Sequence, residues 1–453
     1  MWHGSVNAVK RRADRAKPVH RSAQWQRALV VAACLGAGLV GCSSSSSTAT
    51  TSTARAGTTT TTAIPTTTAL FGNRTPTESS LPTASAGSTS TAEPTTVPET
   101  TTTTIAPKYP LIIEYGFDLT GTATTARNAS KVDALPFDGI TIRARQDPCS
   151  TKPVTDSVAK ADMLAMPKLR RVKHNFLMCR FEDSANADGL SPYDIANDAS
   201  WATISANLKI YAAAAKASGQ FDGIMIDSES YGIGPNPWNY DTIPIPFKLT
   251  QERPWTLPDD ARELAQRRGK QLADAMREGW PSVIIFSLRG AELSDPATYD
   301  PSHQGGDQWA WINELAGPFF IGMVESVHGT AATIITGGES YQQRTQEDFT
   351  NAYEWLKRGL ANSGGPIIPS GAVTAETYTS TVQVANQIFD RDARAAYADF
   401  SAAEVQTLLT YARKASDQYV WFYNEQFDWR NSGDPKTPVP QEFLDAVAAA
   451  RAA

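Results

Sequence analysis

The segment FDGIMIDSESYG, residues 221–232, places two acids at the end of an apolar run. Three consecutive apolar residues, 224–226, are typical of a strand that is buried on both faces. Asp227 and Glu229 follow where such a strand ends. Because side chains two residues apart on a strand point the same way, both carboxylates should face one cavity. The segment therefore predicts a buried parallel strand that delivers acids at its exit.

Apolar runs of the same kind recur along the chain, with helical spacing between them. Trp201, Ile204 and Leu208 follow a helical period, and Ser401 with Glu404 forms a capping box. Strands that alternate with helices predict an α/β fold, here a single (β/α)8 TIM barrel over residues 107–453. The eight expected strands are 111–118, 139–145, 174–180, 223–227, 283–288, 320–326, 332–340 and 419–425.

The C-terminal ends of barrel strands form the face that carries active sites in this fold. Nearly every expected strand ends in charged or hydrogen-bonding residues, and buried charges cost several kcal/mol unless they are paired. Some of them could simply pair with each other, for example Arg143 or Arg289 with a nearby carboxylate. As substrate-binding residues we expect Asp118, Arg143, His174, Tyr231, Trp238, Arg289, Glu325, Tyr341 and Trp429.

The opening segment resembles the strand-four motif of family 18 glycoside hydrolases, D-G-x-D-x-D-x-E. Asp222, Gly223, Asp227 and Glu229 match, whereas Met225 replaces the first inner Asp of that pattern. The resemblance implies that Glu229 is the general acid and that Asp227 supports the N-acetyl group of the substrate. Like-charge repulsion between two such acids would raise the pKa of one of them.

The layout is also similar to that of many retaining glycosidases with this barrel, which place the acid on strand four and the nucleophile on strand seven. With the expected strands, Glu229 and Glu339 fill these places, and Glu425 and Glu325 are the substitutes. Carboxylates about 5 Å apart imply retention, and a wider gap implies inversion. The EYGFD, PFDGI and HNF segments are similar to uncharacterised bacterial barrel proteins, a likeness that implies no activity.

The N-terminus has the pattern of a signal peptide. Residues 1–28 are basic, and an apolar stretch at 28–40 is short for a membrane span. The sequence LVGC at 39–42 resembles the lipobox of bacterial lipoproteins, which implies cleavage after residue 41, acylation of Cys42 and a position on the outer side of the cell membrane. A plain signal peptide or an uncleaved anchor helix is the alternative.

Residues 42–106 are almost entirely Ser, Thr, Ala and Pro, which predicts a disordered linker. The whole chain has 41 basic and 47 acidic residues. Removal of 1–41 takes away seven basic and one acidic residue, which leaves a net charge of −12. This charge argues against nucleic acid and is compatible with a polysaccharide or oligosaccharide substrate. We expect the chain to be a monomer.

Apart from the acylated Cys42, the processed chain keeps Cys149 and Cys179, and a disulfide between them or two unpaired thiols are both open. No zinc-binding pattern occurs, so we expect no metal and no cofactor. Three functions compete: a lipid-anchored glycoside hydrolase, a carbohydrate-binding barrel without turnover, and a solute-binding lipoprotein of a transporter. The last predicts two lobes, and a single closed barrel would exclude it.

Overall fold

The computed structural model describes residues 109–181, 183, 193–230, 238, 259–291, 315–339, 341–359, 373–392, 395, 397–433 and 437–453. All of them lie in one unit of the structure, Pro98–Ala453. The predicted signal peptide, Cys42, the linker 42–106 and Tyr231 lie outside these residues. Among the described helices, none is long and apolar enough to cross a membrane.

Nine strands form one sheet in which every neighbouring pair is parallel. In sheet order β7-β6-β5-β4-β3-β2-β1-β11-β8, the two outermost strands are neighbours in the sequence. The strands are β1 (Leu111–Gly116), β2 (Gly139–Arg143), β3 (Asn175–Phe181), β4 (Phe221–Ser230), β5 (Ile284–Ser287), β6 (Thr333–Thr336), β7 (Val382–Val384), β8 (Gln387–Phe389) and β11 (Tyr419–Asn424).

The segment 382–389 closes this sheet into a ring. Only Ala385 and Asn386 separate β7 from β8. The Ala385 N–H donates to the Thr336 carbonyl of β6 (3.0 Å), and the Asn386 carbonyl accepts from the Trp421 N–H of β11 (3.2 Å). When β7 and β8 are taken as one interrupted strand, nine strands become eight, and the predicted TIM barrel is confirmed.

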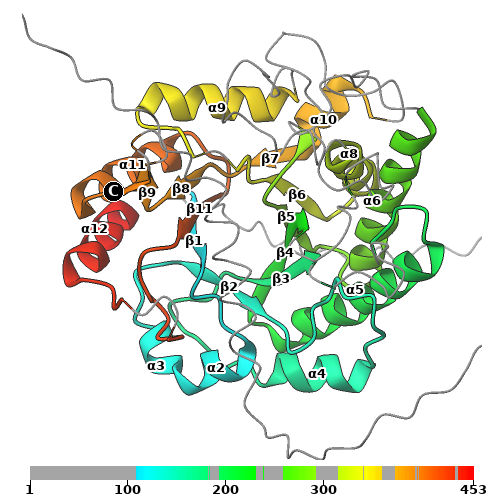
Figure 1. Ribbon diagram of the computed structural model, residues 1–453, viewed down its shortest axis with the longest axis horizontal. Helices are drawn as coiled ribbons and strands as arrows, with labels where there is room; N and C mark the ends of the chain where they lie inside the picture. Colours follow the sequence, from blue (N-terminus) through cyan, green and yellow to red (C-terminus); the bar gives the residue numbers. More distant parts are fainter. Residues whose placement is uncertain are drawn as a thin grey trace, which may run out of the picture. The chain divides into compact units, whose positions relative to one another are not determined.

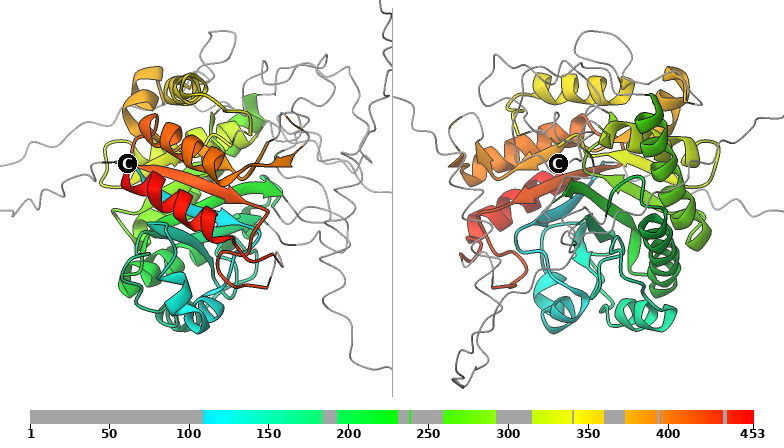
Figure 2. Two further views of the ribbon diagram at one scale, coloured as in Figure 1. Left: turned by 90° about the vertical axis from the view of Figure 1, so that its left-hand side faces the viewer. Right: turned by 45° about the vertical axis from the view of Figure 1, so that its right-hand side comes forward.

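Helices surround the barrel (Figures 1 and 2), with α11 and α12 side by side next to β11. A short antiparallel pair, β9 (Arg391–Asp392) and β10 (Ala398–Asp399), follows β8. The described helices are α2 (Thr122–Arg127), α3 (Ala129–Val132), α4 (Asp156–Leu164), α5 (Asp198–Ser218), α6 (Asp259–Gly279), α8 (Ala316–Val327), α9 (Gln346–Arg358), α10 (Ala375–Thr381), α11 (Ala402–Lys414) and α12 (Gln441–Ala452).

Two apolar clusters stabilise the barrel, one inside the ring and one between the ring and its helices. Ile113 and Phe176 lie in the interior cluster, whereas their neighbours Ile112 and Leu177 lie in the outer one. This alternation follows from the two-residue period of a strand. It also identifies which side chains at each strand end can reach the barrel axis.

The expected strand at 320–326 is wrong, because these residues belong to helix α8. Every residue of α8 except Glu325 is buried. A helix that is buried all round shows no amphipathic period, so its apolar run is indistinguishable from that of a buried strand. The sixth barrel strand is therefore β6, and Glu339 follows strand six and not strand seven.

Strand seven, residues 382–389, was not expected from the sequence. Gln383, Asn386 and Gln387 interrupt its apolar pattern, although Gln387 and Asn386 are buried. The expected strand numbers differ by one from the observed numbers only between residues 320 and 389. The first five strands and the last lie where they were expected.

Cys149 and Cys179 form a disulfide, with Cα atoms 5.2 Å apart. It ties the segment after β2 to β3. The carboxylate of Asp147 lies beside both sulfurs, and these three residues have the spacing of metal ligands. Because both sulfurs are committed to the disulfide, we do not assign a metal site to them.

Candidate active site

Asp227 occupies the C-terminal end of the barrel interior, where it meets side chains from two other strands. The Tyr115 hydroxyl donates to Asp227 Oδ2 at 2.9 Å, and Arg180 Nε lies 3.6 Å from the same oxygen. Arg180 and Asp227 are register partners on adjacent strands, so their side chains point the same way. Asp227 is only 1% exposed. A buried carboxylate with one cation and one hydroxyl is held in a fixed position.

Glu339 is held in the same manner from other elements. Arg289 Nη2, just after β5, lies 2.8 Å from Glu339 Oε2. The Tyr341 hydroxyl donates to Glu339 Oε1. The Glu339 N–H donates to the Leu288 carbonyl (3.1 Å), which fixes the backbone of this segment against the end of β5. Thus each of the two carboxylates, Asp227 and Glu339, has one arginine and one tyrosine as partners.

Tyr115 connects the two carboxylates electrostatically. Burial raises the pKa of Tyr115 well above its usual value, and the negative charge of Asp227 raises it further. The positive charge of Arg180 lowers this pKa, and the negative charge of Glu339 raises it. The negative charges of Asp227 and Glu339 therefore both act on Tyr115 at the C-terminal end of the barrel.

A third carboxylate, Glu425, follows β11. Arg391 Nη1 lies 3.5 Å from Glu425 Oε2, and the Tyr423 hydroxyl hydrogen-bonds to the same side chain. Burial raises the pKa of Glu425, while Arg391 acts in the opposite direction. The carboxylate of Asp390 accepts hydrogen bonds from the backbone N–H groups of Glu425 and Gln426, at 2.9 to 3.2 Å. Asp390 thus positions the backbone on which Glu425 is mounted.

Glu229 lies in β4, and its side chain is outside the described part of the structure. The pairing of β3 with β4 shifts at this point: Arg180 pairs with Asp227, but Phe181 pairs with Ser230. Such bulges bend a strand and often lie beside active sites. The irregularity falls on the segment that carries Asp227 and Glu229.

Two residues of the D-G-x-D-x-D-x-E match have structural roles at other places. Asp222 accepts from the Tyr419 hydroxyl (2.9 Å) and pairs with His174 Nδ1 (2.7 Å) at the N-terminal end of the barrel. A Cβ on Gly223 would lie 1.9 Å from the Ile284 carbonyl oxygen, so close strand packing requires glycine there. The placement of His174 at the substrate face is therefore wrong, because this residue precedes β3 and does not follow it.

Asp118 also lies away from the barrel interior. It is buried with Glu114 and Arg430, and Asn424 Nδ2 donates to it at 3.2 Å. Burial raises the pKa of Asp118 well above its usual value, and Glu114 adds to this effect. The cluster joins the end of β1 to the segment after β11, which is a structural role and not the expected contact with substrate.

The remaining expected residues divide between the core and the site. Trp238 and Trp429 are buried, at 0% and 3% exposure, and pack against Phe319 and Phe137 respectively, so neither offers a ring face to a sugar. Glu325 lies on α8 and accepts from Gln266 (3.2 Å), which removes it from the site. Arg143 ends β2 in register with Met178 of the interior cluster, so its direction is toward the barrel axis.

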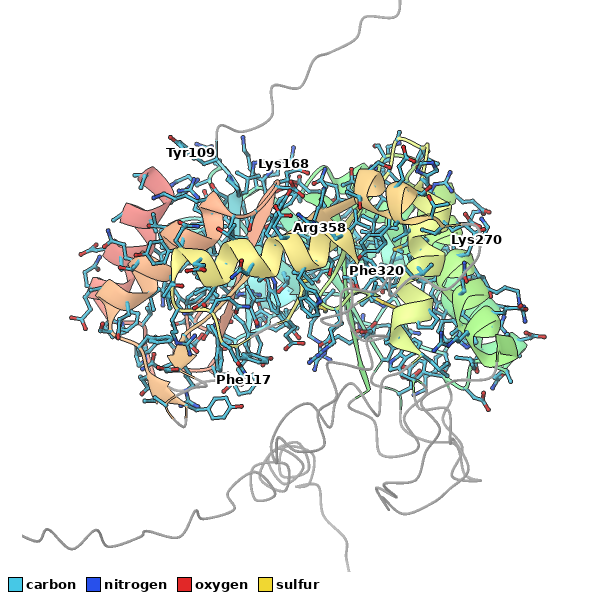
Figure 3. The ribbon with its side chains drawn as sticks, turned by 90° about the horizontal axis from the view of Figure 1, so that it is seen from above. Tyr109, Phe117, Lys168, Lys270, Phe320 and Arg358 are labelled. Atoms are coloured by element: carbon cyan, nitrogen blue, oxygen red, sulfur yellow. A yellow bond between two sulfur atoms is a disulfide. The ribbon has the colours of Figure 1, made fainter. Side chains whose placement is uncertain are left out.

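Sequence reasoning missed Tyr115 and Tyr423, which are register partners on β1 and β11. Tyr115 shares strand parity with Ile113, and Tyr423 with Trp421, and this parity could have indicated that both face the interior. Figure 3 shows Phe117, just after β1, on the side of the barrel opposite to Tyr109 and Lys168. This side carries Asp227, Glu339 and Glu425.

No protein-family model and no curated protein sequence matches the chain. Solved glycoside hydrolases show a distant similarity. An exo-β-1,4-mannosidase from Opitutaceae bacterium strain TAV5 is 13% identical, with 77% of this chain and 60% of that chain covered and a TM-score of 0.40. A β-mannanase from the blue mussel Mytilus edulis is 10% identical (76% and 92% covered, TM-score 0.39), and a family 18 chitinase from Pseudoalteromonas aurantia is 12% identical (75% and 99%, TM-score 0.30). The barrel assignment itself rests on the strand order and on the closure at 382–389.

Proposed function

We propose that this chain is a glycoside hydrolase whose reaction takes place between the ends of β4, β6 and β11. The observation that carries the proposal is that Asp227 and Glu339 are each held by one arginine and one tyrosine at the same end of the barrel. Hydrolysis of a glycosidic bond needs carboxylates in fixed positions around the anomeric carbon.

In the proposed reaction Glu229 gives its proton to the glycosidic oxygen as the bond to the anomeric carbon breaks. Glu339, whose partners Arg289 and Tyr341 favour the ionised form, supplies the negative charge that stabilises the positive sugar. Water then adds to the anomeric carbon and its proton returns to Glu229. Asp227 orients Arg180 and Tyr115 beside the sugar. The anomeric configuration of the first product tells whether Glu339 bonds to the sugar or acts through water.

A carbohydrate-binding barrel without turnover is the second candidate. The observation that favours it is that Asp227 and Glu339 already have close partners. A site that only binds sugar would hold its carboxylates in the same way. The solute-binding alternative predicted two lobes, whereas nine of the described strands form a single ring and only the short pair of β9 and β10 lies outside it.

We propose further that the mature chain is attached to the outer side of the cell membrane by a lipid on Cys42, with residues 42–106 as the tether. The support is the basic and apolar N-terminal segment that ends in LVGC. Incorporation of labelled fatty acid into the wild type, and its loss in Cys42→Ala, is the expected result. Equal labelling of both proteins would contradict this attachment.

The activity test incubates the full chain with a panel of polysaccharides, including β-mannan, xyloglucan, chitin and bacterial envelope glycans. Released sugars are identified by mass spectrometry. We expect products from wild type and a fall of at least about 10³-fold in Glu339→Gln, as is typical when a catalytic carboxylate is removed. Glu325→Gln is the matched control, since it makes the same change on α8, and it should retain full turnover. Binding without products in the wild type would favour the second candidate.

A further inference from the structure

The rim beside Glu339 and Glu425 carries a group of aromatic rings, of which the proposed chemistry uses only Tyr341. Phe117 and Tyr397 are 44% and 56% exposed, which is unusual for large aromatic side chains. Between them lie Tyr423 and Tyr341, both half-buried, and the buried Phe389. We call these five residues the aromatic strip.

The rings of the strip are in contact one after another. Phe117 lies edge-on to Tyr423 (6.2 Å between centroids), Tyr423 stacks on Phe389 (5.5 Å), and Phe389 meets Tyr397 (6.2 Å). Tyr341 packs on Phe389 at 4.9 Å. These contacts connect the two exposed rings through Tyr423 and Phe389, although Phe117 follows β1 and Tyr397 precedes β10.

Two tyrosines of the aromatic strip form hydrogen bonds with carboxylates of the candidate site. The Tyr341 hydroxyl donates to Glu339, and the Tyr423 hydroxyl hydrogen-bonds to Glu425. A molecule that covers the rings therefore also meets two carboxylates. The surface offers ring faces and hydrogen-bond acceptors side by side.

Tyr397 is held at this place at a conformational cost. Its φ of +61° lies in the left-handed region, which is uncommon for a bulky residue. The Tyr397 N–H donates to the Asp392 carbonyl (2.8 Å), and Asp392 pairs with Arg344. Arg344 in turn lies 4.7 Å above the Phe400 ring. The turn that presents Tyr397 is thus anchored to the segment that carries Tyr341.

We propose that the aromatic strip binds successive sugar units of an oligosaccharide, with Phe117 and Tyr397 as stacking platforms on either side of the carboxylates. The face of a sugar ring presents C–H groups that are attracted to the negative face of an aromatic ring, while its hydroxyls point outward to hydrogen-bond acceptors. An apolar peptide would match the rings but would bring no hydroxyl groups to the further acceptor positions of Glu339 and Glu425, since a carboxylate can accept several hydrogen bonds. The inference rests on the proposed function for the place of cleavage, but the binding can be measured without it.

The test measures binding of a glycan ladder, from two to six units of the glycans in the panel, by isothermal titration calorimetry on the full chain. Phe117→Ala and Tyr397→Ala are each expected to weaken binding of the longer members about tenfold, a change that corresponds to about 1.4 kcal/mol. Phe117→Trp and Tyr397→Phe keep a ring and should bind like wild type. Tyr109→Ala is the matched control, because Tyr109 is 42% exposed at the opposite end of the barrel.

The outcomes separate this inference from the proposed activity. Ring-dependent binding without turnover supports the strip and contradicts the glycosidase. Turnover with a KM that is unchanged in Phe117→Ala/Tyr397→Ala, at every glycan length, overturns the strip and leaves the glycosidase. A wild type that binds none of the glycans overturns the strip. Thermal unfolding of each variant checks the fold, and exposed positions should change it little.

Discussion

The Tyr115 hydroxyl donates a 2.9 Å hydrogen bond to Asp227 Oδ2, which links strands one and four of the barrel across 112 residues of sequence. This bond joins a buried donor to a carboxylate that is 1% exposed. Because the pKa of Tyr115 is raised well above its usual value by burial, its hydroxyl stays protonated and keeps donating in alkaline solution. The hydrogen bond therefore holds Asp227 in a fixed position in the candidate site.

Tyr115→Phe removes this donor and leaves the ring in place. We expect the free energy of unfolding to fall by about 1–3 kcal/mol, the usual cost of an unsatisfied buried group. Tyr353→Phe is a close control, since its hydroxyl bonds to Asp417 at the same 2.9 Å but at an exposed site. That variant should lose about 0.5 kcal/mol or less. Urea unfolding measures the free energy of unfolding of both variants. Equal losses would show that the buried Tyr115 hydrogen bond stabilises the fold no more than the exposed Tyr353 bond does.

Arg289→Met removes the cation from Glu339 and keeps a side chain of similar length. Because both partners are mostly buried, at 11% and 7% exposure, we expect a loss of about 3–5 kcal/mol in unfolding free energy and no turnover. The control, Arg358→Met, breaks an exposed pair with Glu354 on α9 and should lose about 0.3–0.5 kcal/mol. Chemical denaturation and product release are the measurements. Wild-type turnover in Arg289→Met would remove Glu339 from the mechanism.

Asp390 predicts a pH dependence of stability. Burial raises the pKa of Asp390 to about 7, against the opposing effect of two backbone N–H groups. The unfolded carboxyl titrates near 3.9, so between about pH 4 and 7 only the folded state holds this proton. The stabilisation is therefore complete below about pH 4 and is lost as the pH rises through 7, at about 1.4 kcal/mol per unit.

Asp390→Asn replaces this carboxyl by a group that does not titrate, and we expect it to flatten the dependence of unfolding free energy on pH over that range. The exposed Asp445→Asn on α12 should leave the wild-type slope in place. Urea unfolding at a series of pH values gives both slopes. A slope that persists in Asp390→Asn would mean that another group is its source.

Gly322 and Gly269 set the distance between α8 and α6. A Cβ on Gly322 would lie 1.9 Å from the Gln266 carbonyl oxygen, and one on Gly269 would lie 1.8 Å from that of Phe319. We expect Gly322→Ala to force the helices apart and to lower the unfolding free energy by about 1–3 kcal/mol. Gly121→Ala, where the nearest atom is 3.6 Å away, is the control. Similar melting temperatures for the two variants would argue against this packing constraint.

The sequence was informative where local pattern and final environment agree. The apolar run before Asp227 is a buried strand, and the capping box at Ser401 and Glu404 begins α11. The pattern failed in α8, where burial on all sides removed the helical period, and in strand seven, where buried amides broke the apolar run. The first failure shifted Glu339 from strand six to strand seven, and the second kept the expected total at eight strands.

The candidate site was predictable in its position but only partly in its members. Carboxylates and arginines at strand ends were identifiable, because their types are rare in a core. Trp238 and Trp429 could not be separated from exposed aromatics, since a loop tryptophan can either cover a core or face solvent. Tyr397 escaped notice because it follows the strand that was missed, and its exposure depends on a turn that only the fold defines.

The most direct test of the central claim compares the wild type with Glu229→Gln and Asp227→Asn, with Glu325→Gln as the control, on the glycan that the panel identifies. Sugars released by each protein are quantified by mass spectrometry at equal amounts of folded protein. The account predicts full release by wild type and Glu325→Gln, and release lowered by at least about 10²-fold in the other two, the lower range for loss of an acid–base group. Undiminished release by both Glu229→Gln and Asp227→Asn would contradict the claim that this end of the barrel is the catalytic site.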